Sequence, residues 1–243
     1  MSFIITIYLK EGIVMASDSR TTFNNQETIP ATKDGDAPIT LMQYGVNSSD
    51  TNYKTFVTSN NVGISTCGDA SINGEPITGY IESFLREYNS AEVDTIANSI
   101  LSYFSEIAPK LNSIFIIAGY KYVKENQYTQ MVYVVSTKDG TVDKVDTTFQ
   151  GAQWHGEYDV LVRLIQPLAI KNTDDNYVDL PQYSIPFNYF TLQDAIEFAE
   201  YATRTTIDTM RFQQRMKTVG GPIDILVLKP NSHQWIARKE LHV

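Results

Sequence analysis

The first twenty residues constrain the fold more than any other stretch, because they hold two apolar runs separated by a turn. Phe3–Leu9 is rich in β-branched and aromatic residues, which is typical of a strand. Residues 10–12 (Lys-Glu-Gly) are typical of a turn, and the second apolar run, Ile13–Ala16, follows them. The segment is therefore predicted to form a β-hairpin with Ser2 at its start.

Ser2 lies where a nucleophile could carry its own base. A serine hydroxyl is a weak nucleophile unless a base accepts its proton, and an α-amine titrates near about 7.7–8.0. Met1 precedes a small residue, so we expect its enzymatic removal to leave Ser2 with a free α-amine. The alternative interpretation is that Met-Ser is simply a common start and that the strand is only a strand.

The remaining chain alternates between groups of strands and pairs of helices. Residues 21–52 are polar and rich in turn residues, which predicts an extended loop or flap at about 21–53, with 39–44 as a candidate strand. Helical spacing predicts helices over 77–88, 93–107, 158–169 and about 192–216, the last opened by a capping box at Thr191. The predicted strands are 54–57, 62–67, 113–120, 130–137, 141–146, 223–228 and 234–238.

This order predicts two layers of sheet with helices outside them, in a single domain spanning 1–243. The apolar fraction of 42% is sufficient for a large core. Trp154-His155 are expected to pack at the start of a helix.

Charge and cysteine content exclude several classes of function. A net charge of −9 argues against a nucleic-acid or anionic-membrane surface, and no apolar stretch reaches the length of a membrane span. The single cysteine, Cys67, suits a reducing cytoplasm and is expected to be a small buried side chain. The three histidines and this cysteine are widely dispersed, so we expect no metal and no cofactor.

Four motifs in register resemble the proteasome β-subunit family of N-terminal nucleophile (Ntn) hydrolases, including its bacterial proteasome-like branch. Ser2 lies sixteen residues before Asp18, within Met-Ala-Ser-Asp-Ser-Arg (15–20). Lys54 and Gly68 have the family's interval from lysine to glycine, with Gly63 between them. Residues 116–120 (Ile-Ile-Ala-Gly-Tyr) and 220–225 (Gly-Gly-Pro-Ile-Asp-Ile) are similar to its central and penultimate strands.

The resemblance implies an α+β fold, a four-layer αββα sandwich, and threonine-peptidase-like chemistry with serine as the nucleophile. Ser2 would attack the substrate carbonyl, Lys54 would supply a nearby positive charge, Asp18 would hold Lys54, and the Gly68 N–H would stabilise the oxyanion. It also implies a ring-type homo-oligomer that acts on a peptide or amide substrate. The residues expected to line the substrate pocket, which would be small and mildly polar, are Thr21, Thr66 and Ala70.

Three positions depart from the family's pattern. The Ser-Gly pair usual before the third helix is replaced by Gln150-Gly151-Ala152, and an Asp and a Ser usual near the last glycines are replaced by Met216 and Val219. These groups normally support the terminal amine. Two further hypotheses therefore stay open: a non-catalytic assembly subunit, and an amidase for a small non-peptide substrate. The sequence does not identify the substrate, the ring size or an unfoldase partner.

Overall fold

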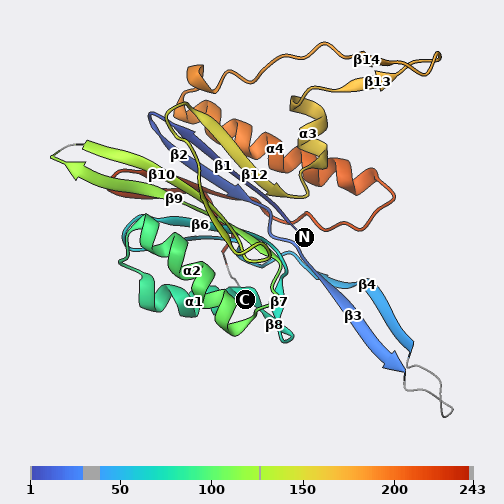
Figure 1. Cartoon of the computed structure of the whole chain (residues 1–243), viewed down its shortest axis with the longest axis horizontal. Coiled ribbons are helices and arrows are strands. Elements are labelled where there is room, and N and C mark those ends of the chain that lie inside the picture. Colours follow the sequence, from blue (N-terminus) through green and yellow to red (C-terminus); the bar gives the residue numbers. More distant parts are fainter. Residues whose placement is uncertain (1, 30–38, 126, 241–243) are drawn as a thin grey trace.

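The computed structural model describes residues 2–29, 39–125 and 127–240. Two five-stranded antiparallel sheets lie face to face, with one pair of helices on the outer side of each (Figure 1). This arrangement confirms the predicted α+β class and the four-layer αββα sandwich. The strands of the first sheet are, in spatial order, β12 (Gly151–Gly156), β1 (Phe3–Leu9), β2 (Gly12–Ser17), β15 (Asp224–Lys229) and β16 (Ser232–Ala237). Those of the second are β11 (Thr141–Lys144), β10 (Gln127–Ser136), β9 (Ser113–Lys124), β6 (Gly63–Gly68) and β5 (Thr55–Val57).

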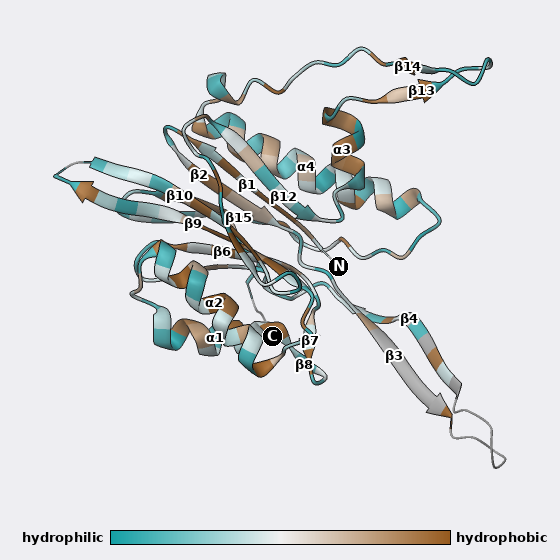
Figure 2. Cartoon of the chain, viewed as in Figure 1, coloured by the Kyte–Doolittle hydropathy of each residue, from teal (hydrophilic) through white to brown (hydrophobic). Residues whose placement is uncertain are grey.

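The helices cover opposite faces of this double layer. Helices α1 (Ile77–Tyr88) and α2 (Val93–Ile107) pack on the second sheet, and α3 (Asp159–Ile165) and α4 (Leu192–Phe212) pack on the first, through two clusters of buried apolar residues. Apolar and polar residues alternate in colour along these helices in Figure 2. The capping box at Thr191 is present, since its hydroxyl accepts from the Asp194 N–H and the Asp194 carboxylate accepts from the Thr191 N–H.

Strands β1 and β2 are buried along their whole length. Successive side chains of β1 point to opposite faces of the first sheet. Ile4 packs in the core between the two sheets, whereas Ile5 packs in the core between the first sheet and helices α3 and α4. Because both faces of the strand are covered, an uninterrupted apolar run is favoured over an alternating one. The predicted hairpin at the start of the chain is confirmed, with Leu9 opposite Gly12.

The segment predicted as a long loop is mainly a two-stranded ribbon. Strands β3 (Thr21–Ile29) and β4 (Ile39–Ser49) pair with each other and extend away from the body of the molecule (Figure 1). The candidate strand at 39–44 is present as part of β4, whereas the strand over 21–29 was not predicted, because its polar, turn-rich sequence lacks the apolar alternation that marks a strand. Its tip, 30–38, lies outside the described residues.

The prediction that Trp154-His155 pack at the start of a helix was also wrong, because residues 151–156 form a strand. Trp154 and His155 lie within β12, opposite Ile5 and Ile4 of β1, and not at a helix start. The smaller paired elements are β7 (Ser71–Ile72) with β8 (Glu75–Pro76), β13 (Ala169–Lys171) with β14 (Tyr177–Asp179), and the single turn η1 (Phe187–Tyr189).

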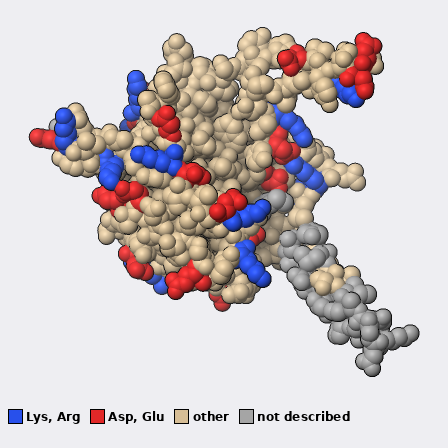
Figure 3. Space-filling view, viewed as in Figure 1, with Lys and Arg blue, Asp and Glu red and all other residues tan. Residues whose placement is uncertain are grey.

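On the face shown in Figure 3, acidic and basic side chains of the described residues are interspersed, without a basic patch. None of the helices in the described ranges is long and apolar enough to cross a membrane.

Candidate active site

The start of β1 places Ser2 at the junction of the two sheets. Ser2 is 6% exposed. The pocket in front of it is lined by residues that follow β2, precede β5 and end β6. Six of the seven residues predicted for the site line this single pocket: Ser2, Thr21, Lys54, Thr66, Gly68 and Ala70.

The seventh, Asp18, lies at the end of β2 and is completely buried. Its Oδ1 accepts from the Lys54 Nζ at 2.8 Å and from the Phe3 N–H at 3.0 Å. Its Oδ2 accepts from the N–H groups of Arg20 at 3.1 Å and Gly220 at 3.0 Å. Four donors from four segments of the chain therefore fix one carboxylate, which compensates for the cost of burying its charge.

Lys54 is held between this carboxylate and the backbone. Its Nζ also donates to the Arg20 carbonyl oxygen at 2.5 Å. Burial lowers the pKa of Lys54 from its ordinary value, while the charge of Asp18 and its hydrogen bond oppose that effect. The ammonium is thus fixed in direction and poorly hydrated at the wall of the Ser2 pocket.

The backbone around Gly68 directs an N–H group towards the same place. The Thr66 N–H donates to the Lys54 carbonyl on one edge of β6 at 2.9 Å, and the Asp69 N–H donates to Asn112 on the other edge at 3.0 Å. Because edges alternate along a strand, the Gly68 N–H faces the Lys54 edge. Gly68 has a φ of +116°, and a Cβ there would lie 2.3 Å from the Asn112 carbonyl oxygen, so a larger residue does not fit.

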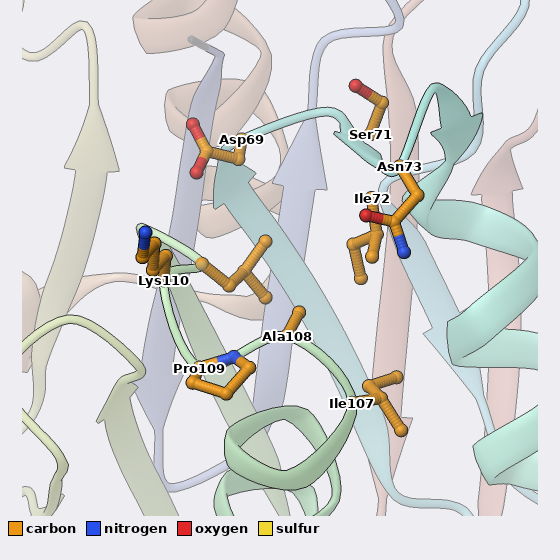
Figure 4. A pocket seen from close by; sticks show the side chains of 9 residues that line it. Asp69, Ser71, Ile72, Asn73, Ile107, Ala108, Pro109 and Lys110 are labelled. Carbon is orange, nitrogen blue, oxygen red and sulfur yellow. The ribbon is translucent and has the colours of Figure 1, made fainter.

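The Ser2 pocket is small, with a volume of about 20 Å³. A neighbouring cavity of about 350 Å³ shares Cys67, Gly68 and Asp69 with it and extends to His155, Met216 and Thr218. A third pocket, of about 380 Å³, lies beyond Asp69 (Figure 4). It has an apolar wall formed by Ile72, Ile107, Ala108 and Pro109, and it contains neither Ser2 nor Lys54.

Cys67 and His155 line the same 350 Å³ cavity, but the described residues show no hydrogen bond between them. Burial raises the pKa of the Cys67 thiol to about 12 and lowers the pKa of His155. The thiol is therefore protonated and the imidazole neutral at physiological pH, which disfavours a cysteine nucleophile.

The three positions that depart from the family's pattern, residues 150–152, Met216 and Val219, lie in different parts of the structure. Residues 150–152 do not lie directly before the third helix, because the rest of β12 separates them from it: Gly151 is opposite Tyr8, at the far end of β1 from Ser2. That prediction was wrong because 151–156 form a strand, and the residues preceding α3 are Gly156, Glu157 and Tyr158. Val219 is buried in the core beneath α4, and Met216 lines the 350 Å³ cavity.

Sequence reasoning missed Glu157. Its backbone N–H donates to the Ser2 carbonyl oxygen at 2.7 Å, and its Oε1 accepts from the Thr218 Oγ1 at 2.8 Å. A local signal that could have indicated this position is the glycine directly before it, Gly156, which ends β12 with a φ of +93°.

Two solved structures resemble the whole chain. One is Anbu (ancestral beta-subunit) from Yersinia bercovieri, with a TM-score of 0.56 and 14% identity over 96% of this chain and 86% of that one. The other is an Anbu (Gly-1) mutant from Hyphomicrobium sp. strain MC1, with a TM-score of 0.57 and 14% identity over 98% and 87%. No protein-family model matches the sequence, and neither does any curated protein. At this identity the likeness establishes the fold alone: the chain shares the αββα fold of these ancestral beta-subunits, which is the fold that the motif resemblance implied.

Proposed function

We propose that this chain hydrolyses amide bonds, with peptides as the main substrate class, using Ser2 as its nucleophile once Met1 has been removed. One observation carries the proposal: Ser2, Lys54 and the Gly68 backbone line one pocket, and the buried Asp18 carboxylate fixes Lys54 in it.

The proposed reaction has two halves. The Ser2 α-amine takes the proton of the Ser2 hydroxyl while Oγ bonds to the substrate carbonyl carbon, and the same amine then passes that proton to the leaving nitrogen as the C–N bond breaks. A water molecule next attacks the resulting ester, again with the amine as base. This step releases a carboxylic acid and restores Ser2.

Two groups around the pocket support the charge changes in this sequence. The Lys54 ammonium favours the deprotonated forms of the neighbouring amine and hydroxyl. The Gly68 N–H would donate to the oxyanion, and one such donor typically contributes about 2.7–4 kcal/mol to the transition state.

The pocket volume supports a substrate with a small side chain on the acyl side. The enclosed space is only about 20 Å³, and Thr21, Thr66 and Ala70 are among the residues that line it. We therefore expect amides with small side chains at that position to be cleaved faster than amides with aromatic ones. The same size leaves room for the second candidate function, cleavage of a small non-peptide amide.

We further propose that the active form is a ring-type homo-oligomer, as the family resemblance implies. Size-exclusion chromatography with light scattering tests this assembly. Oligomers that hydrolyse no peptide or amide would favour the remaining candidate, an assembly subunit without catalysis.

The nucleophile can be tested directly by mass spectrometry. We expect the purified chain to begin at Ser2 and to gain the mass of one β-lactone on that residue. Ser2→Ala should remove the adduct, and Ser59→Ala, the same change in the exposed turn between β5 and β6, should retain it. A retained Met1, or a folded protein without an adduct on Ser2, would reject the proposal.

A further inference from the structure

The backbone of the segment between β12 and α3 is in close contact with the backbone of Ser2, the proposed nucleophile. Gly156 has a φ of +93°, and a Cβ at this position would lie 1.8 Å from the Ser2 carbonyl oxygen. Only glycine fits there. The next residue, Glu157, donates its N–H to that same oxygen at 2.7 Å. Glu157 is therefore fixed beside Ser2 by backbone contacts, independently of its side chain.

The nitrogen of Ser2 faces this segment. In an extended strand, the N–H and C=O of one residue point to the same edge, and the next residue points to the other. Phe3 faces β2, because its N–H donates to the Asp18 carboxylate and its C=O accepts the Asp18 N–H at 3.3 Å. Ser2 then faces the opposite edge, where its C=O meets Glu157. An α-amine formed at Ser2 would point to that edge.

The Glu157 carboxylate has acceptor capacity left for such an amine. Its side chain is 15% exposed, and the Thr218 hydroxyl donates to Oε1. The Arg215 Nη1 is 3.7 Å from Oε2 and instead donates to Asp159 at 3.0 Å. A carboxylate can accept about four hydrogen bonds. The Glu157 carboxylate accepts one from Thr218 and is only partly exposed to water, so it can accept another from a neighbouring amine.

Thr218 also ties Glu157 to the rest of the site. It lies two residues before Gly220, whose N–H donates to the Asp18 carboxylate. The loop that orients Glu157 is thus the loop that helps to hold Asp18 and, through it, Lys54. Asp18 bonds to the Phe3 N–H on the β2 edge of β1, and Glu157 bonds through its backbone N–H to the Ser2 carbonyl on the opposite edge.

We propose that the Glu157 carboxylate accepts a hydrogen bond from the Ser2 α-amine after Met1 is removed, and so positions that amine to take the proton of the Ser2 hydroxyl. This inference rests on the proposed function. Glu157 is a positioning residue, and it supplies the polar support that Met216 and Val219 do not.

The expected electrostatic effect follows from the charges around the amine. Glu157 favours the ammonium form and Lys54 disfavours it, so their effects oppose each other. Asp18 is paired with Lys54, and Arg215 is paired with Asp159 at 3.0 Å and, more distantly, with Glu157 itself at 3.7 Å. Cys67 and His155, which line the adjoining cavity, are uncharged at physiological pH. Removing the charge of Glu157 should therefore lower the α-amine pKa.

The test measures that pKa in a full chain whose Ser2 is exposed by cutting a cleavable leader. The rate of acylation of the α-amine by a limiting amine reagent is followed against pH by mass spectrometry of the N-terminal peptide. Glu157→Gln keeps an oxygen for the Thr218 hydroxyl and should lower the pKa by about 1, in the range of a neighbouring-charge effect. Asp159→Asn removes a carboxylate two residues away, one that pairs with Arg215, and should leave the pKa within about 0.2.

Equal pKa values in the parent chain and Glu157→Gln would overturn the inference, as would an equal decrease in Asp159→Asn. Thr218→Val provides a second variant, which should produce a smaller decrease because Glu157 loses its anchor. Circular dichroism checks that each variant is folded. The measurement needs no turnover, so a chain with the pKa difference but no β-lactone adduct would reject the proposed function alone. An adduct without the difference would reject only the role of Glu157.

Discussion

Two buried lysine–aspartate pairs lie next to each other in this protein, and only one of them faces the nucleophile. Asp18–Lys54 and Asp224–Lys239 come from neighbouring strands, since Asp224 is opposite Ser17. Both carboxylates are fully buried, and the lysine side chains are 6% and 7% exposed. Burial and pairing therefore do not distinguish them.

The surroundings of the two lysines differ. Lys54 lines the Ser2 pocket. Lys239 lies under the ring of Tyr53, with its Nζ 4.4 Å from the ring centroid, and does not line that pocket. Asp18 accepts hydrogen bonds from four segments of the chain, whereas within the described residues the Asp224 carboxylate accepts from the backbone N–H and the Nζ of Lys239. A buried ion pair becomes a candidate catalytic group only where it borders a space that a substrate can enter.

The largest expected effect is a difference between the two lysines in how much each one contributes to the reactivity of Ser2. Lys54→Met should slow formation of the β-lactone adduct on Ser2 by about 100-fold or more, because an adjacent positive charge typically lowers a pKa by about 1–3 and the amine and hydroxyl lose that effect. Lys239→Met should change the rate by less than about threefold, because its charge does not border the pocket. Timed mass spectrometry measures both rates on folded protein. Equal losses would mean that the two pairs act as one electrostatic unit.

The second prediction concerns stability. Asp18→Asn leaves the Lys54 ammonium buried without its counter-ion and places an amide NH₂ among N–H donors, so it should cost about 3–5 kcal/mol in the free energy of unfolding. Asp224→Asn should cost less, about 1–3 kcal/mol, because Lys239 keeps its contact with the Tyr53 ring. Urea titrations give both values. A larger loss for Asp224→Asn would reverse this ranking.

The third prediction uses pH. Burial lowers the pKa of both lysines, with the paired aspartate opposing it in each case. The unfolded chain therefore binds these protons more tightly, and the free energy of unfolding should rise with pH between the lowered pKa and about 10.4. Each lysine-to-methionine variant should lose part of this rise. Urea unfolding from pH 8 to 10 tests the slopes, and a flat profile in the parent chain would contradict them.

The smallest expected effect concerns the residue that lies between the pairs. Tyr53 lines the Ser2 pocket, and its hydroxyl donates to the Lys239 carbonyl oxygen at 3.1 Å. Tyr53→Phe removes this bond and keeps the ring, so it should cost about 0.5–1.5 kcal/mol of stability. The adduct rate on Ser2 should stay within about twofold. A rate loss near that of Lys54→Met would show that the second pair controls the pocket through Tyr53.

Much of the architecture was predictable from local pattern. The hairpin of β1 and β2, the hairpin of β5 and β6, the four helices and the capping box at Thr191 all follow from apolar spacing and turn or cap residues. The ends were less accurate: α3 stops at Ile165 and α4 at Phe212, earlier than predicted. Strand β3 was missed because its sequence is polar and does not alternate between apolar and polar residues.

The sequence by itself determined the layers and brought six predicted residues to one pocket, because apolar periodicity and the spacing of Ser2, Asp18, Lys54 and Gly68 are properties of the chain order. Only the tertiary structure decided what surrounds them. The Gly220 N–H reaches Asp18 across 202 residues, and the Thr218 hydroxyl reaches Glu157 across 61. Such contacts form when distant segments pack together, and no local pattern of residue types encodes which hydrogen-bond donor will meet which acceptor.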